Sequence, residues 1–225
     1  MRRLLLCLVI LTCGAVYAYA GPQEYTFLGW NGGDWTNGYP YYIMPQQGSN
    51  FVTRVMCDDY FHGGEPGQQW DANITNLGTQ NLSQVRFNNI AGPNALYPLR
   101  LYDEAGWILL QTLVEPMAEW KSMNYAVWTL FDSQALCDAG CMDWISQAND
   151  AYHMGFPDTD FNRVNILTPV NQHDPDPNGM QEFLYLAPDP TSQAGGALTT
   201  PEPGTILLVA SGAFAMALRK LKFKS

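Results

Sequence analysis

The segment VMCDDYFHGG, residues 55–64, places one cysteine directly before two carboxylates and five residues before a histidine. A thiolate at Cys57 would be a nucleophile, and His62 could activate it by accepting its proton. Catalysis of that kind also needs a third group that orients the histidine, and the spacing alone reveals none. The same cysteine could equally be half of a disulfide or a small buried side chain. The first alternative describes a cysteine hydrolase, and the others leave the segment without catalytic chemistry.

The first twenty residues have the three parts of a secretory signal peptide. Two arginines precede an apolar run over residues 4–16, and Ala18-Tyr19-Ala20 supplies the small residues of a cleavage site. We expect residues 1–20 to be a signal peptide that is cleaved after Ala20. Export to an oxidising compartment favours disulfides.

Cleavage leaves three cysteines, Cys57, Cys137 and Cys141. The last two lie in CDAGC, where Gly140 allows a tight reversal that brings the sulfurs together. We therefore predict a disulfide between Cys137 and Cys141. Because three is an odd number, Cys57 is then the unpaired thiol.

The exported part of the chain is strongly acidic. Between the signal peptide and the C-terminal apolar run it holds 21 acidic residues and five lysines and arginines, a formal balance of −16. Such a surface repels nucleic acid, which is bound through lysine and arginine, so nucleic-acid binding is excluded. DPDPNG, residues 174–179, begins like a calcium loop but has Tyr185 where the bidentate carboxylate is needed. We predict neither a metal nor a cofactor.

Aromatic residues crowd a glycine-rich stretch near the front of the domain. Trp30, Trp35 and Tyr39 could stack on sugar rings, because exposed aromatics on loops are a common binding surface. They could also simply cap a sheet. Glycines and prolines predict turns or a loop over residues 31–50. These three aromatics are the candidate glycan-binding residues.

Strand-forming segments and helical segments alternate in blocks. EYTFLGW, NFVTRVMCDDY and QQWDANITNL have strand composition, whereas apolar residues recur at helical spacing over about 100–155. RVNILTP and EFLYLA then predict closing strands. The predicted fold class is α+β, with a β-rich N-terminal half, a helical insertion and closing strands. We expect this domain to span 21–187 and a flexible Pro-, Gly-, Ser- and Thr-rich linker to span 188–203.

The end of the chain combines a short motif, an apolar run and a basic tail. Pro201-Glu202-Pro203 precedes an apolar run over 205–218, and four cations follow. This order resembles the PEP-CTERM sorting signal of Gram-negative bacteria. The resemblance implies an exosortase as partner, a C-terminal membrane helix over 204–225, an association with exopolysaccharide, and a location in the cell envelope, on the cell surface or in a secreted matrix.

Two further segments resemble the thioester domains of bacterial surface proteins. In that family a cysteine at the end of an early strand is joined to a glutamine in a later T-Q-x-A-I/V-W segment that opens a helix. Here VMCDD contains Cys57, and MNYAVW, residues 123–128, matches the end of the second motif. Met123 and Asn124 stand where the family has Thr and Gln. The resemblance therefore implies Cys57 and Asn124 as the candidate thioester pair, with an amide side chain one methylene shorter.

Together these features predict an exported surface or matrix protein rather than an enzyme. Its domain would be a non-catalytic binding or structural module associated with exopolysaccharide or surface glycans. The alternatives are a thioester-type covalent adhesin using Cys57 and Asn124, and a cysteine hydrolase.

Overall fold

The computed structural model describes residues 22–30, 40–46, 52–88, 98–170 and 179–188. All of them belong to one compact unit, Gly21–Asp189. The following predicted features lie outside the described residues: the signal peptide with Ala20, residues 189–203 of the linker with its Pro-Glu-Pro motif, the C-terminal helix, Trp35 and Tyr39. No helix within the described ranges has both the length and the apolar character needed to cross a membrane.

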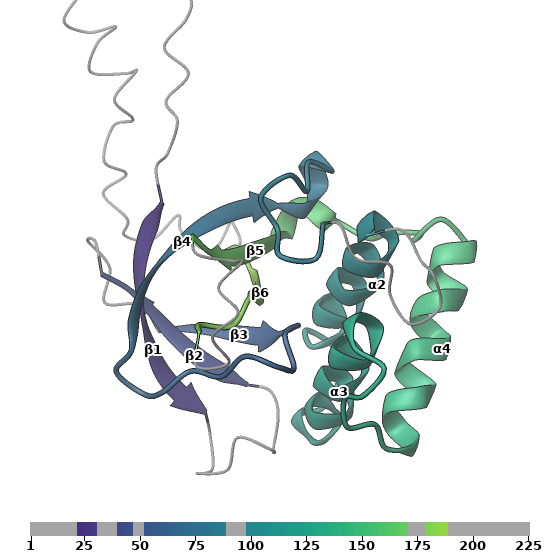
Figure 1. Ribbon diagram of the computed structural model, residues 1–225. Helices are drawn as coiled ribbons and strands as arrows, with labels where there is room; N and C mark the ends of the chain where they lie inside the picture. The colour runs from purple at the N-terminus through teal and green to yellow at the C-terminus, as the bar shows by residue number, and fades with distance from the viewer. Residues whose placement is uncertain (1–21, 31–39, 47–51, 89–97, 171–178, 189–225) are drawn as a thin grey trace, which may run out of the picture. The chain divides into compact units, whose positions relative to one another are not determined.

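Within these ranges, six antiparallel strands close into a barrel in the order β1-β2-β3-β6-β5-β4 (Figure 1). The strands are β1 (Gln23–Trp30), β2 (Tyr41–Pro45), β3 (Thr53–Cys57), β4 (Gln69–Asn76), β5 (Val164–Pro169) and β6 (Phe183–Leu186). Aromatic or β-branched residues occur in every one of them, as expected for half-buried strands.

Strand β2 lies inside the stretch for which a loop was predicted, so that prediction was wrong for Tyr41–Pro45. The surrounding glycines and prolines concealed a short alternating segment. Tyr41 and Ile43 are buried, and the strand pairs with β1 on one side and β3 on the other. Tertiary pairing here outweighs the local turn signal.

The interior of the barrel is filled by aromatic rings around Phe183. Its ring centroid lies 5.8 Å from that of Phe27, 6.1 Å from Tyr41 and 6.2 Å from Trp70. Inward-facing side chains fill small barrels in this way, so the barrel is a packed core.

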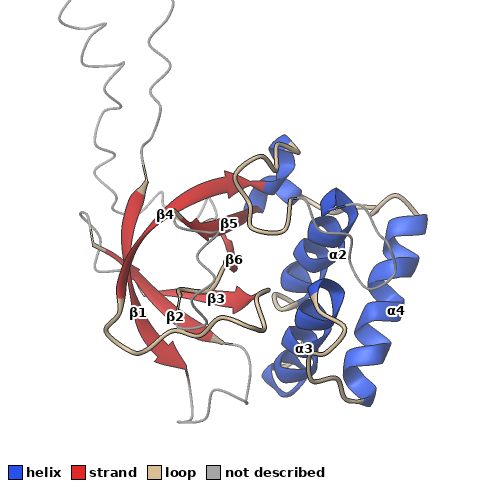
Figure 2. Cartoon of the chain, in the orientation of Figure 1, coloured by secondary structure: helices blue, strands red, loops and turns tan. Residues whose placement is uncertain are grey.

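Among the described residues, three α-helices pack beside the barrel (Figure 2). They are α2 (Pro98–Gln111), α3 (Trp120–Phe131) and α4 (Ala139–His153), and short 3-10 turns occur at η2 (Leu77–Thr79), η3 (Met117–Glu119) and η4 (Phe161–Arg163). The helices contact one another, α3 also contacts β3, and α2 also contacts β5 and β6. The predicted α+β class, with helices in the middle of the chain and closing strands after them, is confirmed.

Candidate functional site

Cys57 is the last residue of β3 and is fully buried. Its thiol donates to the carbonyl oxygen of Asp59 at 3.1 Å, and the Asp59 N–H approaches the sulfur at 3.3 Å. Burial, followed by the nearby Asp58 carboxyl group, raises the pKa of the Cys57 thiol well above its usual value. The cysteine is therefore held as a neutral thiol, which is a poor nucleophile.

Asn124, on α3, lies directly beside this cysteine and is also fully buried. Its side-chain Nδ2 donates to the Cys57 carbonyl oxygen at 3.2 Å, and its Oδ1 accepts from the Cys57 N–H at 3.4 Å. The structure thus brings together the two residues that the thioester resemblance singled out. In the arrangement observed, the Asn124 amide clamps the end of β3 to α3, and the Cys57 sulfur forms no disulfide.

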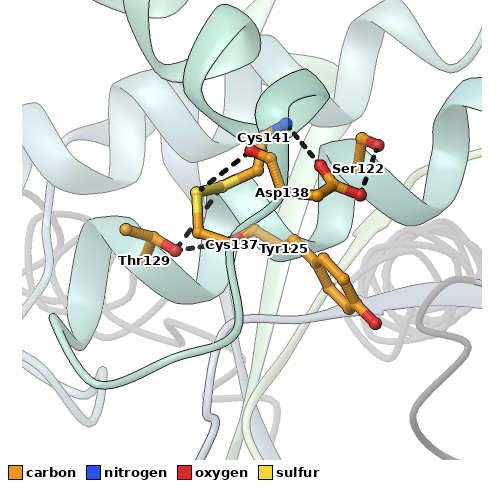
Figure 3. The surroundings of a disulfide bond; sticks show 6 residues. All are labelled: Ser122, Tyr125, Thr129, Cys137, Asp138 and Cys141. Carbon is orange, nitrogen blue, oxygen red and sulfur yellow. Dashed lines mark hydrogen bonds between the residues drawn. A yellow bond between two sulfur atoms is a disulfide. The ribbon is translucent and has the colours of Figure 1, made fainter.

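The other two cysteines form a disulfide at the start of α4, with their Cα atoms 5.4 Å apart (Figure 3). Asp138, the N-cap of α4, accepts from the Cys141 N–H at 2.8 Å and from the Ser122 hydroxyl at 3.2 Å. The Thr129 hydroxyl lies 3.6 Å from the Cys141 sulfur. The bridge therefore fastens the α3–α4 connection to the start of α4.

A buried pair of carboxyl groups lies behind Cys57. Glu182 accepts from the hydroxyls of Tyr102 and Thr168 and from the Arg86 N–H at 2.8 Å. Asp58 is equally buried, and neither of its oxygens meets a donor among the described residues. Burial, and then the Glu182 carboxylate, raises the pKa of Asp58 well above its usual value. Asp58 therefore keeps its proton to a higher pH than an exposed aspartate does.

The adjacent carboxylate, Asp59, orients His62. Asp59 is buried and forms an ion pair with the Arg86 guanidinium. The His62 Nδ1 lies 2.8 Å from the same carboxylate, and the His62 N–H donates to it at 3.2 Å. Arg86 also donates to the Met180 carbonyl oxygen at 2.8 Å. The group that orients His62 is therefore Asp59. The two residues form an Asp-x-x-His pattern in the sequence, although the pattern alone did not assign this role.

A pocket of about 910 Å³ opens between the barrel, the β3–β4 loop and α3. Six aromatic side chains line it: Phe27, Trp30, Tyr41, Tyr60, Phe61 and Trp128. His62, Glu65 and Gln181 are among its polar lining residues. Of the three candidate glycan-binding residues, Trp30 lies in this pocket, and Trp35 and Tyr39 fall outside the described residues.

A bulge in β1 brings Trp30 into the pocket. The pairing of β1 with β2 shifts between Phe27 and Gly29, so Leu28 is the extra residue. Side chains alternate along a strand, and without this residue Trp30 and Phe27 would point to opposite faces. With it, Trp30 pairs with the inward-facing Tyr41, and its ring lies 6.2 Å from that of Phe27. Gly29 adopts a φ of +100°, a conformation that suits glycine.

Trp128 lines the pocket and also interacts with Cys57. Its ring lines the pocket and meets the ring of Tyr60 at 5.4 Å. The Trp128 side chain also interacts with the Cys57 thiol, where it partly offsets the rise in pKa. Trp128 lies one helical turn after Asn124, so α3 supplies both the clamp on β3 and a wall of the pocket.

Comparison with known protein families matches residues 199–222 to the PEP-CTERM protein-sorting motif. The chain carries a PEP-CTERM sorting signal. The predicted resemblance is confirmed at this end of the chain, and the signal marks an exported, cell-surface protein and implies processing by an exosortase. A search of curated proteins finds no match.

Two solved structures are similar to the chain. The N-terminal thioester domain of a surface protein from Clostridium perfringens is 11% identical, covers 72% of this chain and 97% of its own, and has a TM-score of 0.46. The N-terminal domain of the Streptococcus pyogenes pilus tip adhesin Cpa is 10% identical, covers 74% of this chain and 94% of its own, and has a TM-score of 0.42.

Proposed function

We propose that the domain is a non-catalytic glycan-binding module, which attaches this exported surface protein to exopolysaccharide. The observation that carries the proposal is the pocket with six aromatic walls. Its volume of about 910 Å³ is near the upper end of the range for small-molecule sites. A site of that size accommodates part of a sugar chain rather than only a small metabolite.

The chemistry of the walls suits a carbohydrate. The flat faces of Trp30, Tyr60 and Phe61 offer apolar surface against which the C–H face of a sugar ring packs. Phe61 is 61% exposed, so the face of its ring is accessible to a ligand in the pocket. His62 and Glu65 place polar groups beside these rings, where sugar hydroxyls need hydrogen-bond partners.

Hydrolysis of the bound glycan is not part of the proposal. Glycosidases use two carboxyl groups on either side of the scissile bond. Among the described lining residues Glu65 is the one carboxylate, and the Asp58–Glu182 pair is buried away from solvent. Hydrolysis with Cys57 as the nucleophile is also disfavoured, because Cys57 is a buried, protonated thiol that donates to the Asp59 main-chain carbonyl oxygen.

A glycan array probed with the purified full-length chain tests this function. We expect binding to at least one class of polysaccharide, and Phe61→Ala should weaken it because it removes an exposed wall of the pocket. Tyr152→Ala is the matched control, since Tyr152 is 38% exposed on α4 and is not among the lining residues. A blank array, or equal losses in the two variants, would contradict the proposal.

A covalent adhesin is the second candidate, and the contact between Asn124 and Cys57 favours it. The Cys57 sulfur would attack the Asn124 side-chain carbonyl carbon, the C–N bond would break, and ammonia would leave with the thiol proton. Both groups would first have to leave their present main-chain partners. Intact mass of the denatured, alkylated chain decides the question. A mass one ammonia lower with no alkyl group on Cys57, a loss that is absent in Cys57→Ala, establishes the bond, and an alkylated Cys57 with no loss of ammonia rules it out.

A further inference from the structure

We infer that the pocket selects a glycan whose sugars carry a free, protonated amino group. This inference rests on the proposed glycan-binding function and names the class of sugar. It follows from three hydrogen-bond acceptors on the pocket walls, from the charge of those walls, and from their aromatic faces.

The first acceptor is the imidazole of His62. An ionised Asp59, held by its ion pair with Arg86, can only accept hydrogen bonds. The proton shared with Asp59 therefore belongs to the His62 Nδ1, 2.8 Å away. In the neutral ring this leaves a lone pair on Nε2, which has no partner among the described residues. A ligand group that reaches this nitrogen has to be a donor.

The second acceptor comes from the segment before β6, and the third comes from the β3–β4 loop that also carries His62. The Gln181 Nε2 donates to the His62 carbonyl oxygen, and this leaves the Gln181 Oε1 buried without a partner among the described residues. Glu65 is exposed, and its N–H donates to the Gln68 Oε1 at 3.0 Å, which steadies the loop that carries the carboxylate. Each of these groups is best satisfied by a ligand N–H or O–H.

The charge of the walls favours a cation. Glu65 supplies a negative charge, and no lysine or arginine is among the described lining residues. The nearby Arg86 is engaged by Asp59 and by the Met180 carbonyl oxygen. A uronate would meet repulsion, whereas an ammonium would be attracted both by Glu65 and by the faces of the aromatic rings. The formal net charge of −16 over the exported part of the chain also attracts a cationic ligand.

Three kinds of substituent at the second ring carbon can be ranked from these walls. An ammonium is cationic and carries three donors, so it suits both the acceptors and the aromatic faces. A hydroxyl donates one hydrogen bond and carries no charge. An acetamide carries no charge and has one N–H donor, and its carbonyl oxygen cannot pair with groups that are themselves acceptors, which is costly where those groups are left unpaired.

Calorimetric titration of the full-length chain with three matched tetrasaccharides tests the inference. They are β-linked oligomers of glucosamine, N-acetylglucosamine and glucose, which differ only at the second ring carbon. Near neutral pH we expect the glucosamine oligomer to bind at least about tenfold more tightly than the other two. Glu65→Gln should reduce that affinity by about tenfold, whereas Asp143→Asn, which removes an exposed charge outside the pocket, should leave it unchanged.

The outcomes separate this inference from the function on which it rests. Equal binding of the glucose or acetylated oligomer, lost in Phe61→Ala, would overturn the amino-sugar inference and leave the glycan-binding function standing. Binding of the glucosamine oligomer that Glu65→Gln and Asp143→Asn reduce equally would mean attraction to the acidic surface as a whole, and would also overturn the inference. Failure of every oligomer and every array glycan to bind would overturn both.

Discussion

Replacing Asp58 by asparagine should stabilise the fold increasingly as the pH rises. Asp58 is fully buried and interacts with Glu182, Arg86, Cys57 and Tyr102. Its pKa is raised well above the usual value, first by burial and then by the Glu182 carboxylate. Asparagine keeps the size of the side chain and can donate to Glu182 through its amide, but it has no proton to lose.

The sign and the slope follow from proton linkage. The folded chain holds the Asp58 proton above about pH 4, where the unfolded chain has released it. The contribution of Asp58 to the free energy of unfolding is therefore complete below the pKa that Asp58 has in the unfolded chain. It declines as the pH rises toward the pKa that Asp58 has in the folded chain. One proton corresponds to a slope of at most about 1.4 kcal/mol per pH unit. The free energy of unfolding of Asp58→Asn should exceed that of the wild type by an amount that grows at up to this rate.

Urea unfolding followed by tryptophan fluorescence measures this difference at a series of pH values. Asp143→Asn serves as the control, because Asp143 is an exposed carboxylate on α4. We expect the control to run parallel to the wild type while Asp58→Asn diverges from it above about pH 4. A constant difference between Asp58→Asn and the wild type would refute the assignment of a retained proton to Asp58.

Three further predictions concern the elements that position the site. Gly29→Ala should cost more than about 1 kcal/mol in unfolding free energy, since φ is +100° and the new Cβ would lie 3.1 Å from Pro66, and a stability equal to the wild type would argue against the bulge. Asn124→Ala should cost about 1–3 kcal/mol in urea unfolding because it leaves the buried N–H and carbonyl of Cys57 without their side-chain partner, and a neutral result would deny the clamp. Cys137→Ser should cost about 2 kcal/mol, as expected for a disulfide of sequence separation 4, and reduction of this variant should lower its stability no further.

The fold class was within reach of the sequence, whereas the closure of the sheet was not. Strand composition and helical spacing are local properties, and they predicted the strand-forming segments, the helical middle and the closing strands. Barrel closure depends on β6 lying between β3 and β5. The residues of β3 and β6 that pair with each other are more than a hundred positions apart in the chain. Strand β2 was missed because glycines and prolines on both sides outweighed its short alternation.

The sequence also indicated some residues of the site, whereas the fold alone brings in others. The family motif, rather than periodicity, indicated that Asn124 would lie near Cys57, and the structure places their groups in contact. Asp59 could have been paired with His62 from their spacing of three residues. Glu182 could not have been assigned to Asp58, because only the folding of β6 beside β3 brings it there.

The indole N–H resonances of the seven tryptophans provide the most direct test of where a glycan binds. Trp30 and Trp128 line the pocket, whereas Trp107 and Trp144 pack against each other between α2 and α4, with ring centroids 6.3 Å apart. Titration of the labelled full-length chain with the glucosamine oligomer should shift the signals of Trp30 and Trp128 and leave those of Trp107 and Trp144 in place. Shifts confined to Trp107 and Trp144, or no shift at saturating sugar, would contradict a glycan site in the aromatic pocket.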